Sequence, residues 1–401
     1  MAGKNPMNLL YNLTAVQPIH NAKFHGGGSY GEVVFFAILE RLFGEKDSKD
    51  FNGRLFAAFD AGKFLDPKIV EACKKFGVPL IDIREKSPQR IIDENQIDTF
   101  YTPLYSLEKK WDVNVPRFVF TWHGVRALEM KYSPLGMRFA RTFAQKAEAL
   151  VRYRDLWKKH FYKPKYERLA HRIAEGKAFA ITVSEHSRAS IQNFFPALSH
   201  VRIPVFYSPM MEVKPKGSLP ANVLPGKYFL LTSGARFEKN NLLAVKAFDG
   251  LVEAFPSLDP ELKAVVTGVP FPKVYLKGLL HPERFVFLDY VEAEELELLH
   301  QNAYAFIFPS LNEGFGYPPM QSMRYGVPLA ASGSTSIPEI CGDAALYFDP
   351  YSESEIRNRM IQLLDGEIHA LYAERAYDRY LKVRKRQISD LEKTVRYIMD
   401  Y

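Results

Sequence analysis

The sequence that decides the fold of this chain is residues 308–328, FPSLNEGFGYPPMQSMRYGVP. It predicts the end of a strand, a glycine-bearing loop and a short helix. Pro318 or Pro319 suits the first helical turn, where a backbone N–H has no partner inside the helix, and Gly326 suits the C-terminal stop. Strand, loop and helix in this order are a unit of α/β folds with parallel sheets.

The loop between that strand and that helix is suited to contact an anionic ligand. Gly314 and Gly316 let the backbone approach a ligand closely, because a glycine has no Cβ. The N-terminus of the following helix directs backbone amides at an anion. Glu313, at the mouth of the loop, can accept hydrogen bonds from sugar hydroxyls.

The rest of the chain repeats the alternation of strands and helices. Short β-rich runs alternate with helix-period segments, which is typical of α/β layers around parallel sheets. Strands are expected near residues 8–14, 54–59, 98–102, 117–121, 178–183, 228–232, 263–267, 284–288, 304–308 and 329–332. After Asp349-Pro350 the pattern is helical only.

The length of 401 residues suits two domains of ordinary size. Residues 208–226 contain four prolines and few apolar anchors, which is typical of a linker. We therefore expect an N-terminal domain at residues 1–207 and a C-terminal domain at residues 227–380. The last helix, residues 381–401, is expected to pack back on the N-terminal domain.

Composition sets the expected compartment. The 47% of hydrophobic and 25% of charged residues are ordinary for a globular protein and argue against disorder. The two cysteines, Cys73 and Cys341, predict neither a disulfide framework nor a Cys-based zinc site. No stretch approaches 18 consecutive apolar residues, and we expect no signal peptide in residues 1–10. We expect a cytoplasmic protein that meets a membrane only from its surface.

The formal net charge of +7 favours anionic partners. Residues 137–177 hold twelve Lys and Arg against four acids, interleaved with Trp157, Phe161, Tyr162 and Tyr166. This segment is either a solvated helix pair with a buried aromatic stripe or a basic-aromatic surface for peripheral contact with the inner membrane face. We expect no specific nucleic-acid binding, because no recognisable reading module is present.

The strand–loop–helix stretch resembles the E-x7-E motif of the retaining glycosyltransferases of family 4, which have the GT-B fold. The resemblance implies two Rossmann-like domains with parallel sheets facing a deep interdomain cleft, and C-terminal helices that cross back. It implies that Glu313 contacts the donor sugar and that Gly314, Phe315 and Gly316 bind the donor. The second acid of the motif usually binds the nucleotide ribose. Here it is Gln321, which can hydrogen-bond a ribose diol without charge assistance.

Other parts of the C-terminal half resemble the same family in the same order. Arg236 and Lys239 match residues that grip the donor diphosphate, where cations stabilise the charge that builds on the leaving phosphate. A surface salt-bridge role is the alternative for both. Tyr290 lies in the segment that matches the reader of the nucleotide base, and a structural role is its alternative. Residues 332–350 complete the resemblance.

In the N-terminal half the resemblance rests on His123 and on a glycine-rich stretch. His123 matches the active-site histidine of the family, with Gly124 where an Asp usually follows; the alternative is a histidine satisfied in the core. Residues 25–32, HGGGSYGE, contain G-x-G-x-x-G, which alone is a weak dinucleotide signature. We prefer the glycine loop of the family, with Gly27 and Gly28 binding the donor, and a structural turn is the alternative.

The resemblance implies a cytoplasmic transferase of polysaccharide biosynthesis. It would move a sugar, with retention and without a metal ion or a cofactor, from a nucleotide-diphosphate sugar to a hydroxyl of a saccharide or lipid-linked acceptor. The expected catalytic residues are His123, Arg236, Lys239 and Glu313. A non-catalytic subunit that binds a partner enzyme or carbohydrate is the alternative, supported by Gln321 and Gly124.

Substitutions follow from this interpretation. We expect Lys239→Ala and Glu313→Ala each to cut transfer by orders of magnitude while leaving the fold intact. We also expect Gln321→Glu to be tolerated, because it restores the usual acid.

Overall fold

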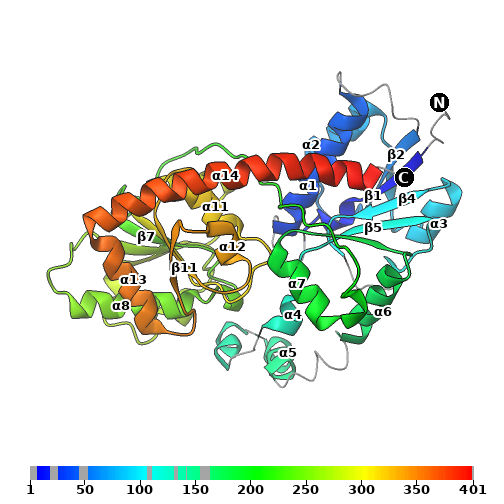
Figure 1. The fold of residues 1–401 in the computed structure, drawn as a ribbon. Helices are drawn as coiled ribbons and strands as arrows, with labels where there is room; N and C mark the ends of the chain where they lie inside the picture. Colours follow the sequence, from blue (N-terminus) through cyan, green and yellow to red (C-terminus); the bar gives the residue numbers. More distant parts are fainter. Residues whose placement is uncertain are drawn as a thin grey trace. The chain divides into compact units, whose positions relative to one another are not determined.

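A computed structural model of the chain describes residues 7–18, 26–44, 53–105, 111–130, 134–140, 142–153 and 163–399. Internal contacts divide the chain into two compact units (Figure 1). Unit 1 comprises Met1–Val125, Lys163–Met211 and Lys385–Tyr401, and unit 2 comprises Arg126–Tyr162 and Glu212–Arg384. Each unit contains a six-stranded sheet with all neighbouring strands parallel.

The sheet of unit 1 has the strand order β3-β2-β1-β4-β5-β6. Its strands are β1 (Met7–Asn12), β2 (Gly53–Phe59), β3 (Leu80–Asp82), β4 (Thr99–Thr102), β5 (Arg117–Trp122) and β6 (Phe179–Thr182). Its helices are α1 (Gly26–Phe43), α2 (Pro67–Phe76), α3 (Pro88–Glu94), α6 (Lys163–Ala174) and α7 (Glu185–Phe194). The order reverses between β1 and β4, as in Rossmann folds.

The sheet of unit 2 has the order β12-β11-β10-β7-β8-β9, which is the same topology with the reversal between β7 and β10. Its strands are β7 (Tyr228–Leu231), β8 (Lys263–Val266), β9 (Phe285–Phe287), β10 (Ala305–Phe308), β11 (Leu329–Ser332) and β12 (Ala345–Phe348). Its helices are α4 (Arg126–Glu129), α5 (Phe143–Tyr153), α8 (Asn241–Ala254), α9 (Lys273–Leu276), α10 (Ala293–Asn302), α11 (Tyr317–Arg324), α12 (Ile337–Cys341) and α13 (Glu353–Leu364). The two-sheet α/β fold that the sequence predicts is therefore confirmed.

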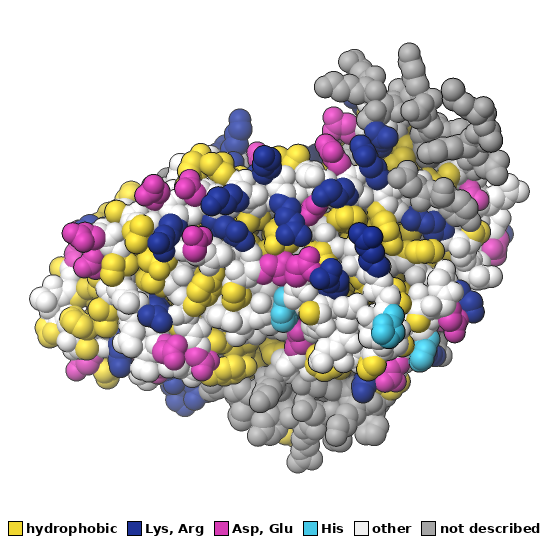
Figure 2. Space-filling model, in the orientation of Figure 1, with side chains coloured by type: hydrophobic (Ala, Val, Ile, Leu, Met, Phe, Trp, Pro, Cys, Tyr) yellow, Lys and Arg dark blue, Asp and Glu magenta, His cyan; other side chains and the backbone are white. Residues whose placement is uncertain are grey.

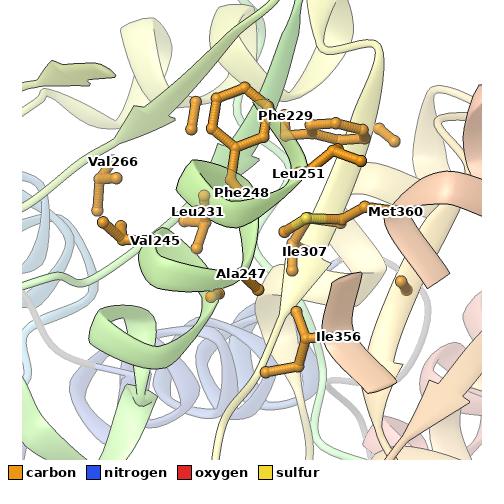
Figure 3. Packing of buried hydrophobic residues seen from close by; sticks show 14 of the residues in the cluster. Phe229, Leu231, Val245, Ala247, Phe248, Leu251, Val266, Ile307, Ile356 and Met360 are labelled. Atoms are coloured by element: carbon orange, nitrogen blue, oxygen red, sulfur yellow. The ribbon is translucent and has the colours of Figure 1, made fainter. Parts of the chain in front are cut away.

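The core of unit 2 lies where α8 and α13 pack against the sheet (Figure 3). Phe229 of β7 meets the ring of Phe248 of α8 edge to face, with 5.7 Å between the centroids. Ile307 of β10 and Met360 of α13 are also fully buried in this cluster. Strands covered on both faces read as continuous apolar runs, which is why the segments YFLL and AFIF signal strands in the sequence.

Local signals set the ends of the helices. Ser184 caps α7 by accepting a hydrogen bond from the amide of Ser187 at 3.1 Å, as the sequence indicates. Pro318 and Pro319 fall in the first turn of α11, and Gly326 follows that helix with a φ of +64°. The strands β3 and β12 are missing from the sequence prediction; both lie at an edge of their sheet.

The helix α14 (Gly366–Met399) contributes to both units, because the contacts place Lys385–Tyr401 in unit 1. Arg117 of β5 donates to the carbonyl oxygens of Tyr397 and Ile398, at 2.5 and 2.7 Å. Lys and Arg side chains lie along the band where α14 runs (Figure 2). No helix among the described residues is long and apolar enough to cross a membrane.

The contact division differs from the predicted domain limits in one segment. Residues 126–162 fall in unit 2, although the sequence groups them with the N-terminal half. Within this segment Phe139 packs on the rings of Phe237 and Tyr275 of unit 2. Contact grouping is no test of which part folds alone, so the domain limits stay a prediction.

Candidate active site

The two loops that follow β7 and β10 meet at the point where the strand order of unit 2 reverses. Lys239 ends a short 3-10 helix, Phe237–Lys239, after β7, and Glu313 lies in the loop after β10. The carboxyl ends of neighbouring parallel strands lie at one edge of a sheet, and such a reversal opens a crevice for ligands. The topology thus brings these two predicted residues together.

Lys239 and Glu313 form a buried ion pair. Nζ of Lys239 lies 2.6 Å from Oε1 of Glu313, and the two side chains are only 6% and 9% exposed. The hydroxyl of Ser310 donates to the same carboxylate oxygen at 2.5 Å. Nζ also lies 5.3 Å from the centre of the Phe308 ring. Residues from both strand ends therefore fix one carboxylate and one ammonium.

The charges of the pair depend on each other. Burial alone would raise the pKa of Glu313, but the ammonium of Lys239, the guanidinium of Arg126 and the hydrogen bonds outweigh it and lower the pKa. Burial lowers the pKa of Lys239, and the attraction of Glu313 offsets part of this shift. Removing either partner would leave the other charge buried and uncompensated.

The glycine-bearing loop is hydrogen-bonded to the segment between β11 and α12. The amide of Glu313 donates to the hydroxyl of Thr335 at 3.1 Å. The hydroxyl of Ser336 donates to the carbonyl oxygens of Glu313 and Phe315, each at 3.0 Å. Gly316 has a φ of +117°, which only glycine adopts readily. These hydrogen bonds therefore fix the backbone of the loop at Glu313 and Phe315.

The first turn of α11 is a weaker anion site than the sequence suggests. Pro318 and Pro319 follow Tyr317 in that turn and have no backbone N–H. Two of the amide hydrogens on which a helix N-terminus relies are therefore missing. Charge for an anion must come mainly from side chains nearby.

Arg236 is engaged in a salt bridge with Glu238. Its Nη2 and Nε lie 2.6 and 2.9 Å from Oε1 of Glu238. Nη1 of Arg126 lies 3.3 Å from the same oxygen. Burial would raise the pKa of Glu238, but the two guanidinium groups outweigh it and lower that pKa to about 2. Glu238 thus holds two cations beside the Lys239–Glu313 pair.

Gln321 and Tyr290 lie elsewhere in unit 2. Gln321, in the second turn of α11, donates from Nε2 to Oε1 of Glu297 at 2.8 Å. Tyr290 follows β9 and is 57% exposed, and its hydroxyl donates to Glu292 at 3.4 Å. Their side chains are not in contact with the Lys239–Glu313 pair among the described contacts.

His123 lies in unit 1, directly after β5. It is half-buried, and Nε2 lies 2.8 Å from the carbonyl oxygen of Pro103. A carbonyl only accepts, so Nε2 carries the hydrogen of this bond. The ring of Tyr30 meets that of His123 edge to face at 4.9 Å. Gly124 has a φ of +123°, which explains why an Asp does not follow.

The predicted glycine loop is the first turn of a helix. Gly27, half-buried, and Gly28, buried, both belong to α1, and His25 lies outside the described residues. Gly31 is the glycine of this motif that cannot carry a side chain, because a Cβ there would lie 2.8 Å from Cγ of Pro103 and 2.9 Å from Cγ2 of Val16. This third glycine lets α1 pack closely against the loop that holds His123.

Sequence reasoning missed several polar residues of the site. Ser310 stands three residues before Glu313, a short spacing that could have suggested a local hydrogen bond. The other contacts join separate loops and helices, and no local signal reports them. The missed residues are Arg126, Glu238, Glu297, Ser310, Thr335 and Ser336.

Residues 223–379 match the family described as "Glycosyl transferases group 1". Arg236, Lys239, Tyr290, Glu313 and Gln321 lie within this match. The chain is 29% identical over 218 residues to O-antigen chain mannosyltransferase B of Escherichia coli, covering 50% of this chain and 55% of that protein. The chain thus spans about half the length of that relative.

Two solved structures share the fold across nearly the whole chain. A glycosyltransferase from Rickettsia africae has a TM-score of 0.63 at 14% identity, and covers 99% of both chains. Anabaena Alr3699/HepE in complex with UDP-glucose has a TM-score of 0.60 at 15% identity, and covers 97% of this chain and 99% of that one. The chain therefore has the GT-B fold, with two Rossmann-like sheets.

Proposed function

We propose that the chain is a glycosyltransferase that moves a sugar from a nucleotide-diphosphate sugar to a hydroxyl of a saccharide acceptor, with retention at the anomeric carbon. The observation that carries this proposal is the Lys239–Glu313 pair, 2.6 Å apart and buried at the strand reversal of unit 2. It lies inside the segment that matches the group 1 transferases. A buried charge pair at a ligand edge is costly for stability alone and suits a functional site.

The chemistry needs positive charge beside the leaving phosphate. The bond from the anomeric carbon to the phosphate oxygen breaks, and the acceptor oxygen bonds to the same face of that carbon. The acceptor proton passes to the departing phosphate oxygen. Lys239 has three N–H donors and can contact both Glu313 and a phosphate, while Arg236 stabilises the same developing charge. We propose that these cations suffice without a metal ion or a cofactor.

The remaining predicted residues position the donor. In this proposal Glu313 accepts hydrogen bonds from sugar hydroxyls, and the Gly314–Gly316 loop lies against the sugar. Gln321 contacts the ribose and Tyr290 lies near the base. His123 orients the sugar or the acceptor, and Gly27 and Gly28 bring the start of α1 close to the donor.

We propose mannose as the transferred sugar and a growing surface polysaccharide as the acceptor. The support is the similarity to an O-antigen chain mannosyltransferase of Escherichia coli. A non-catalytic binding subunit is not favoured, because the candidate catalytic residues Arg236, Lys239 and Glu313 are all present in the matched segment.

A panel of donors tests the proposal. The protein is incubated with mannose and glucose esters of UDP, GDP, ADP and dTDP and with an oligomannoside acceptor. With the sugar ester of one of the four nucleotides, mass spectrometry should reveal an acceptor that is heavier by one hexose. NMR should show that the new linkage has the anomeric configuration of the donor. A folded protein that neither hydrolyses nor transfers from any donor would remove the proposal. An inverted product would remove retention.

We also propose peripheral contact with an anionic membrane through the basic-aromatic segment 137–177. In its described part, α5 exposes Phe143 by 89% and Leu150 by 40%, with Lys146 exposed between them. Residues 141 and 154–162 of this segment lie outside the described residues. Flotation with vesicles of phosphatidylglycerol is the test. Phe143→Ser should weaken it, and equal flotation of both proteins would contradict the contact.

A further inference from the structure

A buried carboxylate lies behind Gln321 in the contact between α10 and α11. The side chain of Glu297 is only 3% exposed. Its Oε1 accepts from Nε2 of Gln321 at 2.8 Å, and its Oε2 accepts from the hydroxyl of Tyr325 at 2.7 Å. Nη1 of Arg324 lies 3.5 Å from Oε2. Both oxygens of Glu297 are therefore occupied by donors from α11 and the residue that follows it.

This contact fixes the orientation of the Gln321 amide. A carboxylate only accepts hydrogen bonds, so Gln321 must turn its NH2 group toward Glu297. Its Oε1, on the other branch of the amide, then faces away from α10. Among the described residues, none donates to that oxygen in the contacts of Gln321. The half-buried side chain thus presents its oxygen as an acceptor and commits one of its two N–H donors to Glu297.

Tyr325 strengthens the arrangement from the other side. Burial and the hydrogen bond to Glu297 raise the pKa of Tyr325, so its hydroxyl stays protonated and keeps donating. Since Oε2 is held by Tyr325 and Arg324, Glu297 cannot rotate to release Gln321 without breaking these bonds.

We propose that Glu297 is a positioning residue that holds the amide oxygen of Gln321 toward the ribose hydroxyls of the nucleotide donor. This inference rests on the proposed function, and it assigns a new residue to it. In place of an acid at position 321, the negative charge is that of Glu297 on the neighbouring helix. In this proposal it acts on the ligand by orienting the amide of Gln321.

The pair also explains why position 321 holds a glutamine. In Gln321→Glu a carboxylate would face Glu297 at the present 2.8 Å separation, and two like charges at such a distance repel strongly. The expectation from sequence that this substitution is tolerated is therefore reversed. Restoring the usual acid requires Glu297 to lose its charge at the same time.

Two variants test whether Glu297 sets the orientation of the Gln321 amide. In Glu297→Gln the new amide keeps its oxygen on Tyr325 and turns its NH2 toward Gln321, which must flip and offer its own NH2 to the ribose. In the exchange Glu297→Gln/Gln321→Glu, the new amide at position 297 donates to the new carboxylate at position 321, whose second oxygen again faces the ribose. Glu294→Gln is the matched control, since Glu294 is exposed on the same helix.

The experiment compares the wild type, the two single variants, the exchange and the control. Calorimetry measures binding of the preferred nucleoside diphosphate and of its 2′,3′-dideoxy analogue, and thermal unfolding measures Tm. The wild type should prefer the ribonucleotide about two- to tenfold, the worth of one hydrogen bond. Glu297→Gln should change the size of this preference, because the flipped Gln321 offers N–H groups to the ribose where the wild type offers an oxygen. Gln321→Glu should lower Tm by several degrees. The exchange should recover both, and the control should change neither.

The outcomes are distinct. An unchanged ribose preference in Glu297→Gln, or an unchanged Tm in Gln321→Glu, would overturn the inference while leaving the proposed function standing. A wild type that binds no nucleoside diphosphate would overturn the proposed function, and the role at the ribose with it. If Tm falls in both single variants and does not recover in the exchange, Glu297 contributes only to packing, and the inference is likewise overturned.

Discussion

The two sheets have the same strand order, yet their strand reversals are held in different ways. In unit 1 the amide of Asn12 donates to the hydroxyl of Thr102 at 3.1 Å, across the ends of β1 and β4. In unit 2 the ion pair of Lys239 and Glu313 joins the loops after β7 and β10. A neutral hydrogen bond stands where the other unit has two buried charges.

This difference favours the reversal of unit 2 as the ligand site of the proposed function. The amide oxygen of Asn12 already accepts from the amide and the hydroxyl of Thr14, so this cluster is satisfied within the protein. The attraction between Lys239 and Glu313 contributes less free energy to folding than the removal of both charges from water costs. An anion can bind to the ammonium of Lys239, and sugar hydroxyls can donate to the carboxylate of Glu313. The Asn12 cluster is neutral and its hydrogen-bonding groups are already occupied, so it offers no such interactions.

The largest expected effect is on stability. Lys239→Ala leaves the Glu313 carboxylate buried without its cation and should lower the free energy of unfolding by about 3–5 kcal/mol. Thr102→Val in unit 1 removes a neutral bond and should cost about 1–2 kcal/mol. Urea unfolding followed by circular dichroism measures both, and equal losses would break the comparison. The expectation that Lys239→Ala leaves the fold intact is revised accordingly.

The next effect is on transfer. Glu313→Gln keeps the shape of the side chain but removes the charge that Lys239 and Ser310 hold in place. The rate of transfer should fall by about a hundred- to a thousandfold, which is the usual effect of removing one group that stabilises the transition state. His123→Gln in unit 1 should cost less. Initial rates with the preferred donor decide, and a larger loss in His123→Gln would place the chemistry in unit 1.

The units should differ in the sign of a pH effect. The pKa of Glu238 in unit 2 is lowered to about 2, so its ionised form stabilises the fold above the ordinary carboxyl pKa, and this contribution disappears as the pH falls toward 2. Glu238→Gln should therefore cost at most about 3 kcal/mol at pH 7 and little at pH 2.

Glu32 in unit 1 is the counterpart. Burial and the nearby Asp66 raise the pKa of Glu32, so stability falls as the pH rises through the ordinary carboxyl pKa to the raised one. Glu32→Gln should thus leave unit 1 equally or more stable at pH 7. Thermal unfolding from pH 2 to pH 8 compares both variants, and shifts of the same sign at pH 7 would contradict the assignment.

A smaller effect tests the packing that supports His123. Gly31→Ala forces a methyl group against Pro103 and Val16 and should cost about 1–3 kcal/mol. Gly366→Ala at the start of α14 is the control, because a Cβ there meets no atom within 4 Å. Thermal unfolding should separate the two variants, and indistinguishable Tm values would show that α1 can move aside.

The smallest expected effect is that of a chelator. If Lys239 and Arg236 supply the positive charge at the leaving phosphate, EDTA should leave the rate of transfer unchanged. Dialysis against EDTA followed by a rate measurement checks this. A loss that Mg²⁺ or Mn²⁺ restores would mean that the cations of unit 2 do not act alone.

Most of the fold could be read from the sequence, because buried parallel strands are apolar throughout and glycine and proline mark their ends. The two missed strands, β3 and β12, are edge strands with a neighbour on one side only. The candidate site was predicted as separate residues, and Lys239 and Glu313 were placed in one site. That they touch depends on the reversal between β7 and β10.

The parts that the sequence does not reveal are contacts across loops and helices. Glu297 and Gln321 are 24 positions apart, and only the packing of α10 on α11 brings them together. Ser336, at the start of α12, donates to the glycine-bearing loop. Such contacts have no periodicity and no local spacing, so a single sequence does not report them.

The last turns of α14 bear on the order in which the chain folds during synthesis. Gln387 and Asp390 are buried in unit 1, where they bind the backbone of Ser208 and Tyr207. The ribosome makes these residues after the whole of unit 2. Although domains usually fold from the N-terminus onward, unit 1 gains these contacts only after the residues of unit 2 have been made.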